Sequence, residues 1–507
     1  MISSSWADKW NLKPLTALLI LATIPRLVSM LFSQGYGMHD DHFLIIEAAQ
    51  SWLDGKDYNA WLPQNRPDAT PTGHSWFYVG LHYYFFMFLE SIGITAPAAK
   101  MFLVRIIHGF YSLLLIPPFY RLVKKYGGEE RAWNATLIMA LLWFLPILSV
   151  RNLVELVCVP PLMWAFWLLL KEDKQPLKHV IFAGFLVGVA MALRFQIILY
   201  AGGIGLVLLF QKKIGKAVLF GIALLVALFF TQIGDLFLWG RPFAEITEYI
   251  MYNFRNSETY FNRPWYMYFG TLAGLLLPPL SVALMFGYGR MVRKYVMLAV
   301  PSLIFFAFHS YFPNKQERFI VPFIPFLILL GYLGWTEWIE SPGRKEIWKK
   351  VHKFSWTMFW VLNGILLLAV TPASTKKSRV EVMTILGEQP NFNGAIVERS
   401  IEYSTFLLPV FYAHDTSWNS VFYITKSNYD EEAAIILNRP IDQRAKYLVM
   451  FEPDELDSRL VRFEQTFSAK LTPIAEVESS YLDRLLHWLN PNNDNEKGFI
   501  YKIEYQR

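Results

Sequence analysis

Long apolar runs alternate with short polar loops over residues 14–372 of the chain. A helix needs about 20 consecutive apolar residues to cross a lipid bilayer. Runs near that length predict spans at 14–33, 99–120, 132–150, 153–170, 180–194, 196–211, 217–238, 265–288, 296–312, 319–338 and 355–372. The pattern therefore predicts an all-α polytopic membrane protein with about eleven transmembrane helices.

Basic residues in the loops between these runs predict the orientation. Five loops carry most of them, at 121–131, 171–178, 212–216, 290–294 and 344–353. Because loops rich in Lys and Arg stay on the cytoplasmic side, the five loops are expected on one side of the membrane. This places the N-terminus inside and the C-terminus outside. The first span has no clear cleavage site after it and is interpreted as a signal anchor.

One apolar segment, 76–94, does not fit as a span. It is aromatic and contains His82 and Glu90, and counting it as a crossing would place several basic loops outside. We therefore expect an interfacial or re-entrant helix on the outer side. The first outer loop is then long, covering 34–98, and its segment 41–54 also has an amphipathic pattern.

The pattern changes after Pro372. Short apolar strands and helical patterns alternate in a more polar background, at 430–437, 447–451, 455–466 and 499–503. We expect residues 1–372 to form a transmembrane catalytic domain and residues 373–507 a small α/β domain on the outer face. That domain has no Asn-x-Ser/Thr acceptor, which favours a bacterial inner membrane and periplasm over the endoplasmic reticulum of a eukaryote.

Composition supports the membrane prediction. Of the 507 residues, 54% are hydrophobic and only 17% charged, whereas soluble proteins carry about 25% charged residues. The formal net charge is +6, but the excess lies in the loops, so nucleic acid is not an expected partner. Cys158 is the single cysteine, which excludes an intrachain disulfide.

Charged residues gather beside span ends on the predicted outer side. They are Asp40, Asp41, Glu47, Arg151, Glu155, Arg194, Arg241, Glu245, Glu248, Arg255, Glu258, Arg263, Lys315, Glu317 and Arg318. Ionisable groups at a bilayer usually pair or act chemically. Carboxylates beside cations suit a lipid-linked phosphate substrate. The cations would stabilise the leaving phosphate, and a carboxylate would accept the proton of an attacking hydroxyl.

Two motifs resemble a known family. Residues 40–47, Asp-Asp-His-Phe-Leu-Ile-Ile-Glu, resemble the Asp-Glu-x-Phe-x-x-x-Glu signature of glycosyltransferase family 22. These GT-C enzymes transfer mannose from dolichyl-phosphate mannose. Residues 314–325 are similar to the family's His-Lys-Glu-x-Arg-Phe…Pro motif. Further similar stretches lie between them in the family's order, at 239–243, 253–254 and 263–268.

The chain also departs from the family pattern. Asp41 stands where the family has its second acidic residue, and Asn314 and Gln316 replace the His and Glu of the second motif. These changes bear on the sugar and the acceptor more than on the fold or the reaction class. A bacterial relative that uses an undecaprenyl-phosphate-linked sugar fits them.

The resemblance implies an inverting single displacement that moves a hexose, with mannose favoured, from a polyprenyl-phosphate carrier to a glycan or lipid-linked acceptor. Asp40 would be the general base, and Asp41 would orient the acceptor or share a proton. Lys315 and Arg318 would bind the lipid phosphate. Further substrate-binding residues expected from the same cavity are Glu317, Arg255, Arg263, Glu47 and Arg151.

Alternatives stay open at this point. Glu47 either orients the loop or has a structural role alone. His39 and His42 beside the two aspartates suggest a metal, but without a second ligand cluster we expect no metal and no cofactor. A transporter or flippase for a lipid-linked sugar predicts matched broken helices in repeated halves, which the sequence does not show. A structural membrane subunit, or a GT-C transferase acting on protein or lipid A, would share the architecture.

Overall fold

The chain divides into two compact units, each described here by itself. The computed structural model describes residues 12–58, 61–63, 70–259, 262–390, 392–400, 406–414, 421–491, 493 and 495–506. Unit 1 comprises Met1–Leu31, Trp61–Leu81 and Val104–Pro372, and unit 2 comprises Phe32–Ala60, His82–Leu103 and Ala373–Arg507. Helices α5 (Trp76–Ser91) and α6 (Pro97–Ser112) contribute residues to both units.

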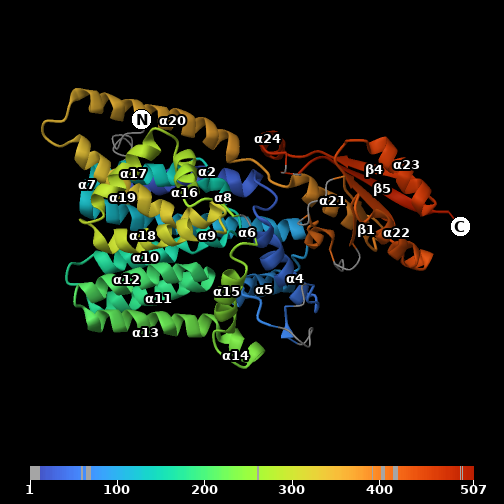
Figure 1. Cartoon of the computed structure of the whole chain (residues 1–507), viewed down its shortest axis with the longest axis horizontal. Coiled ribbons are helices and arrows are strands. Elements are labelled where there is room, and N and C mark those ends of the chain that lie inside the picture. The colour runs from blue at the N-terminus through green and yellow to red at the C-terminus, as the bar shows by residue number, and fades with distance from the viewer. Residues whose placement is uncertain are drawn as a thin grey trace. The chain divides into compact units, whose positions relative to one another are not determined.

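The regular secondary-structure elements among the described residues of unit 1 are all helices. Its other helices are α2 (Pro14–Phe32, whose last residue belongs to unit 2), η3 (Leu113–Leu115), α7 (Ile116–Leu141), α8 (Leu145–Ser149), α9 (Val154–Val157), α10 (Val159–Leu170), α11 (Leu177–Leu193), η4 (Phe195–Ile197), α12 (Ile198–Phe210), α13 (Ile214–Thr231), α14 (Ile233–Trp239), α15 (Ala244–Arg255), α16 (Met267–Leu275), α17 (Leu280–Met291), α18 (Val296–Tyr311), η5 (Glu317–Phe323), α19 (Ile324–Ile339) and α20 (Glu346–Val370). Figure 1 shows α10 to α13 lying side by side. Ridges of apolar side chains on such helices pack against one another.

Helix α19 lies inside this bundle and is almost entirely buried. Small residues allow α17 to approach it closely. A Cβ atom on Gly287 would lie 2.0 Å from the Gly331 carbonyl oxygen, and one on Gly334 would lie 2.0 Å from the Gly287 oxygen. Glycine pairs of this kind let helix backbones meet in membrane proteins. The contact fixes α19, whose N-terminal extension η5 carries Arg318.

Five helices among the described residues are long and apolar enough to cross a membrane. They are Pro14–Phe32, the continuous run Pro97–Leu141, Ile214–Thr231, Glu317–Ile339 and Glu346–Val370. Four shorter apolar helices accompany them, Val154–Leu170, Leu177–Leu193, Phe195–Phe210 and Val296–Tyr311. The sequence segment 265–288 is divided into α16 and α17. A multi-pass membrane protein follows, while the figure of about eleven crossings stays a prediction.

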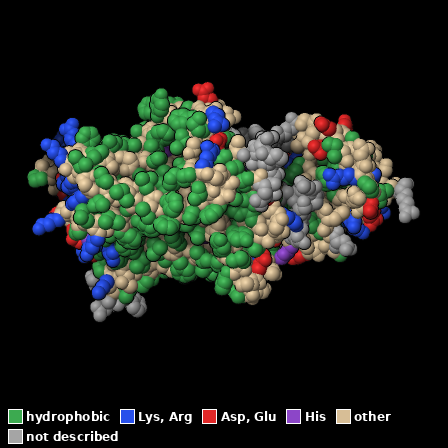
Figure 2. Space-filling model, turned by 90° about the horizontal axis from the view of Figure 1, so that it is seen from below, with side chains coloured by type: hydrophobic (Ala, Val, Ile, Leu, Met, Phe, Trp, Pro, Cys, Tyr) green, Lys and Arg blue, Asp and Glu red, His purple; other side chains and the backbone are tan. Residues whose placement is uncertain are grey.

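The surface of the helical region carries the same signature. Figure 2 shows apolar side chains over its flank and Lys and Arg side chains gathered at one end. Such an end matches the cytoplasmic loops of a multi-pass protein. Helix α5, which covers most of the segment 76–94, is not among the nine apolar helices found in the described part of the chain. Its interfacial placement stays a prediction.

Unit 2 is built on a five-stranded mixed sheet, as Figure 1 shows. The strands β1 (Ala395–Glu398), β2 (Val421–Ile424), β3 (Tyr447–Phe451), β4 (Ala469–Val477) and β5 (Gly498–Tyr505) have the order β2-β1-β3-β5-β4. The first three pair in parallel, and β5 is antiparallel to β3 and β4. Its helices are α3 (His39–His42), η1 (Phe43–Glu47), α4 (Ala48–Leu53), α21 (Lys377–Gly387), η6 (Val410–Ala413), α22 (Tyr429–Leu437), η8 (Ile441–Gln443), α23 (Leu456–Phe467) and α24 (Tyr481–Leu489).

The small α/β region predicted after Pro372 is therefore confirmed. Strands β1 and β3 are buried along their whole length, as parallel strands usually are. Ile396 and Leu448 form one core with Ile436 of α22 and Phe463 of α23. This core fixes the carboxyl ends of the parallel strands.

Residues just after α2 pair with residues just after α20. Ser33 Oγ donates to the Ala373 carbonyl at 2.5 Å, and the Thr375 N–H donates to the Gln34 carbonyl at 3.1 Å. Gly35 has φ +84°, and a Cβ there would lie 1.8 Å from the Thr375 oxygen. The sequence analysis placed residues 34–98 with the membrane domain. In the structure, residues 32–60 and 82–103 group with the C-terminal domain. The hydrogen bonds above tie residues 33 and 34 to it, and Lys100 Nζ, which donates to Gln50 and Glu90, ties the second segment to the first.

Candidate active site

The predicted acidic loop of unit 2 forms the short helix α3. Asp41 is 3% exposed, and its Oδ2 accepts the Met38 N–H at 3.1 Å. A carboxylate at this position satisfies a backbone donor at the start of a helix and matches the helix dipole. Asp40 is only half-buried. The two neighbouring carboxylates therefore differ, since Asp41 stabilises the turn and Asp40 is the more accessible.

Glu47 ties this loop to the C-terminal part of unit 2. Its Oε1 lies 3.1 Å from His42 Nε2, and both of its oxygens lie 3.0 Å from the Phe411 N–H. The carboxylate is 3% exposed. Because it accepts from His42 and from the Phe411 N–H over 360 positions away, Glu47 connects the acidic loop to the C-terminal segment of unit 2. Its part in substrate binding stays a prediction.

Aromatic rings hold His42 in place from two sides. The His42 ring stacks on Tyr36 at 4.8 Å and on Tyr412 at 5.7 Å between ring centroids. His39 stacks on Phe43 at 4.4 Å. Burial lowers the pKa of His39, because desolvation disfavours the charged imidazolium. The buried side of the loop that carries Asp40 thus combines aromatic rings with the hydrogen-bonded side chains of His42 and Glu47.

Unit 1 contains a second buried set of charges, made of Glu155, Arg194 and Arg318. Arg194 Nη1 lies 2.5 Å from Glu155 Oε1, and Arg318 Nε lies 3.5 Å from the same oxygen. Both guanidinium groups also contact the Phe319 ring, at 5.0 Å and 5.5 Å from its centroid. We call Glu155, Arg194 and Arg318 the arginine cluster. Its members come from α9, the end of α11 and η5.

Several polar atoms of this region are buried without a hydrogen-bond partner among the described residues. They include Glu155 Oε2, Nε and Nη2 of Arg194, and Nε2 of the nearby His309. Buried polar groups in native proteins nearly always have partners, including water. An arginine with two unused donors, in a setting of low dielectric, favours an anionic ligand. The arginine cluster is therefore a candidate phosphate site.

The other predicted substrate-binding residues occupy different places. Lys315 is 2% exposed, and its Nζ donates to the carbonyls of Arg263 at 3.0 Å and Phe312 at 2.5 Å. Burial lowers the pKa of Lys315. Arg151 is also buried, at 4% exposure. Lys315 thus fastens the loop before η5 through carbonyl oxygens.

Three predicted residues have side chains in solvent. Arg255 lies in the last turn of α15 and pairs with Glu248 at 3.4 Å. Arg263 and Glu317 are exposed, and Arg263 contributes its carbonyl oxygen to Lys315. Conversely, Glu155 and Arg194 were predicted only as two of the charges beside span ends. Their flanking apolar runs were the signal that both are buried.

The described residues offer no obvious metal site. No group of three or more His, Cys, Asp or Glu side chains in the described part of the chain is arranged to hold a metal ion. His42 is instead engaged with Glu47. The chemistry that this chain presents by itself is a half-buried carboxylate in unit 2 and an arginine cluster in unit 1.

The fold resembles two membrane enzymes of known structure. ArnT from Cupriavidus metallidurans, solved with undecaprenyl phosphate, matches with a TM-score of 0.59 at 12% identity, covering 98% of each chain. The Archaeoglobus fulgidus oligosaccharyltransferase, solved with Zn and sulfate, matches with a TM-score of 0.50 at 12% identity. That match covers 90% of this chain and 69% of the other. At such low identity the similarity establishes the GT-C fold alone. No curated protein matches the sequence significantly.

A match to a family model identifies the protein family of this chain. The model of the Alg9-like mannosyltransferase family matches residues 17–399, which include both the acidic loop and the arginine cluster. This confirms the resemblance drawn from residues 40–47 and 314–325 and favours an enzyme over the transporter alternative. The chain belongs to the Alg9-like mannosyltransferase family and is a glycosyltransferase.

Proposed function

We propose that this enzyme moves a hexose, with mannose favoured, from a polyprenyl-phosphate carrier to a glycan or lipid-linked acceptor. The observation that carries the proposal is the arginine cluster with its unused donors, buried within a bundle of membrane helices. A phosphate attached to a lipid would bring a permanent anion to that depth. ArnT, which shares the fold, binds undecaprenyl phosphate, and this supports the same class of carrier.

The proposed reaction is an inverting single displacement. The acceptor hydroxyl oxygen attacks the anomeric carbon of the donor while the bond from that carbon to the phosphate oxygen breaks. Asp40 takes the hydroxyl proton as general base, and the electron pair leaves with the lipid phosphate. Asp41, whose Oδ2 accepts the Met38 N–H, orients the acceptor or shares a proton with Asp40. A single displacement needs no covalent intermediate on the protein.

The arginine cluster would stabilise the charge that develops on the leaving phosphate. Arg194 offers Nε and Nη2, and Arg318 lies beside it on the same carboxylate. Fixed donors in a water-poor site stabilise such charge strongly, because they need no reorganisation during the reaction. Glu155 keeps the two guanidinium groups together before the donor binds. Lys315 positions Arg318 by fastening the preceding loop.

The proposal extends to the membrane topology, the cellular location and the cofactor requirement of the enzyme. We propose about eleven crossings, with residues 1–372 forming the catalytic membrane domain and 373–507 an outer domain. A bacterial inner membrane is the favoured location. We also propose that transfer needs no cofactor or metal, so that chelation with EDTA leaves the rate unchanged.

The test is transfer of labelled mannose from polyprenyl-phosphate mannose in proteoliposomes containing the full-length enzyme. Wild type should transfer label to a glycan or lipid-linked acceptor. Asp40→Asn should lower the rate by about 10²–10⁴-fold, the usual contribution of a general base. Asp430→Asn, an exposed aspartate in α22, is the matched control and should keep the wild-type rate.

Each result decides a part of the proposal. Equal rates for Asp40→Asn and wild type would remove Asp40 as the base. Transfer to peptides or to lipid A, with none to glycans, would replace the proposed acceptor. Transfer from a different polyprenyl-linked sugar only would replace mannose and leave the carrier class in place.

A further inference from the structure

Helix α24 presents an apolar face that the described structure leaves exposed. Tyr481, Leu485, Trp488 and Leu489 are 47%, 49%, 77% and 64% exposed. Their spacing of four, three and one residues places them on one side of the helix. Single exposed apolar side chains are ordinary on a protein surface. Leu485, Trp488 and Leu489 on a nine-residue helix, beside the partly exposed Tyr481, form a contiguous apolar patch of the kind that marks an interaction surface.

The opposite side of α24 is fixed at its N-terminal end. Ser480 caps the helix, and its Oγ also donates to the Ser374 carbonyl at 2.7 Å. Asp483 is 1% exposed and accepts the backbone N–H groups of Lys376 at 2.9 Å and Lys377 at 3.2 Å. These bonds hold the helix so that its apolar face points away from unit 2.

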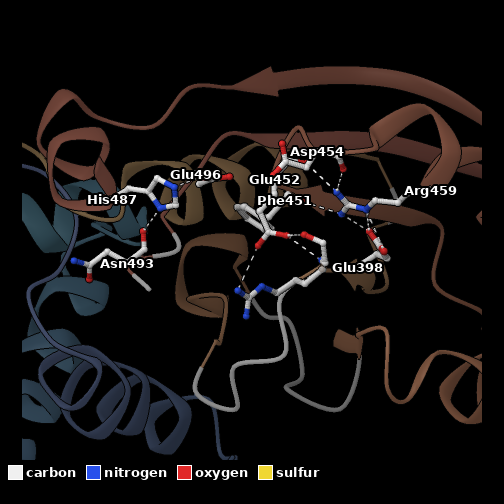
Figure 3. Close-up of polar contacts among 10 residues, drawn as sticks. Glu398, Phe451, Glu452, Asp454, Arg459, His487, Asn493 and Glu496 are labelled. Atoms are coloured by element: carbon white, nitrogen blue, oxygen red, sulfur yellow. Dashed lines mark hydrogen bonds and ion pairs between the residues drawn. The ribbon is translucent and has the colours of Figure 1, made fainter. Parts of the chain in front are cut away.

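The C-terminal end of α24 is fixed as well. His487 Nδ1 lies 2.9 Å from the Asn493 carbonyl oxygen, and its Nε2 lies 2.7 Å from Glu496 Oε1. Figure 3 shows His487 directed toward Asn493, with Glu496 beside it. With both ends attached through polar contacts, α24 is a rigid support for its apolar face.

The attachment point lies close to the membrane. Ser374 is four residues beyond Val370, the last residue of the candidate span α20. An extended chain of that length covers no more than about 14 Å. Ser33, next to the last residue of the candidate span α2, donates to Ala373 in the same segment. The N-terminus of α24 is therefore bound to chain that leaves two membrane spans.

The composition of α24 fits the interface between lipid and water. Trp and Tyr concentrate at that level of membrane proteins, and amphipathic helices insert an apolar face about 5–10 Å into it. Arg484 is 60% exposed at the side of the patch and lies 3.9 Å from Glu478 in an exposed ion pair, which leaves its guanidinium able to meet lipid phosphate groups. Because the helix is attached to chain that leaves two candidate membrane spans, this composition favours a lipid surface over a protein partner.

We propose that α24 is an interfacial helix, whose apolar face is inserted into the bilayer leaflet at whose surface α2 and α20 end. The partner is the phospholipid bilayer itself. The helix gives unit 2 a membrane contact in addition to its covalent connections to the spans. This inference does not depend on the proposed donor or acceptor.

The test measures the depth of single spin labels in the full-length enzyme. Leu489→Cys and Trp488→Cys are labelled and reconstituted in vesicles of phosphatidylethanolamine and phosphatidylglycerol. Val461→Cys is the matched control, because Val461 is an apolar residue 52% exposed on α23 of the same unit. Wild type, whose single cysteine Cys158 is buried, gives the background.

Labels on α24 should collide preferentially with oxygen, which concentrates in lipid, rather than with a water-soluble nickel chelate. We expect the ratio of the two collision rates to exceed that at Val461 by at least about threefold, as for a depth of about 5–10 Å. An equal ratio at all positions would place α24 in water. Low collision rates with both reagents would show that protein covers the patch. Either result would overturn the proposal.

Discussion

Two buried glutamates, Glu47 in unit 2 and Glu155 in unit 1, show how similar residues acquire different roles. Both oxygens of Glu47 accept hydrogen from the Phe411 N–H, and one also contacts His42. Glu155 contacts two arginines through one oxygen, while its second oxygen and two donors of Arg194 have no hydrogen-bond partner among the described residues. A buried carboxylate such as Glu47, whose two oxygens both accept hydrogen bonds, stabilises the fold. A buried cluster with capacity left over is suited to a ligand.

Glu245 of unit 1 supports the same distinction. Its carboxylate accepts from Gly73 N–H at 2.6 Å, from Trp76 Nε1 at 2.9 Å and from Trp239 Nε1 at 2.8 Å. Here too the bonds connect distant segments of one unit. Burial nevertheless raises the pKa of Glu245, because desolvation outweighs these bonds.

The largest effect on catalysis should come from removing an arginine from the arginine cluster. Arg194→Ala removes the donors that we assign to the lipid phosphate, and should lower kcat/KM for the donor by about 100-fold or more. Arg255→Ala removes an exposed arginine paired with Glu248 and should stay within about twofold, as surface pairs contribute little. Initial rates at varied donor concentration measure both. Equal losses of kcat/KM in Arg194→Ala and Arg255→Ala would contradict the distinction between the buried arginine cluster and an exposed arginine.

A smaller effect should follow from loosening the acidic loop. Glu47→Gln removes the charge that holds the Phe411 N–H and His42, so Asp40 should be less well positioned. We expect kcat to fall about tenfold with the donor KM nearly unchanged, since charged hydrogen bonds contribute about 1.5–3 kcal/mol. Glu381→Gln on α21, which removes a partly exposed carboxylate paired with Lys377, is the control. A rise in donor KM without loss of kcat would instead assign Glu47 to donor binding.

The smallest effect concerns Glu245 and pH. Because its folded pKa is raised above the unfolded value, the folded state binds the proton more tightly. Its stabilising contribution is therefore complete below the unfolded pKa and lost as pH rises through the folded pKa. Relative to Glu245→Gln, the Tm of wild type should rise by a few degrees as the pH falls from about 7 to about 5. If the Tm of wild type minus that of Glu245→Gln stays constant or falls as the pH is lowered, the raised pKa of Glu245 is contradicted.

The sequence predicted the membrane class, the α/β region and the two motifs, because periodicity and motif order are local properties. It did not separate Arg318, which is buried beside Glu155, from Arg255, which is exposed on α15. Charges at span ends look alike in a sequence, and only packing decides their burial. Nor could it group Ser33 with Ala373, because that hydrogen bond depends on tertiary structure.

The central claim is that the arginine cluster binds the donor phosphate. Its most direct test is binding of undecaprenyl phosphate to the purified full-length enzyme, measured for wild type, Arg194→Ala, Arg318→Ala and Asp40→Asn. The account predicts that both arginine variants raise Kd by about tenfold or more, while Asp40→Asn binds like wild type. Wild-type affinity in both arginine variants would contradict it.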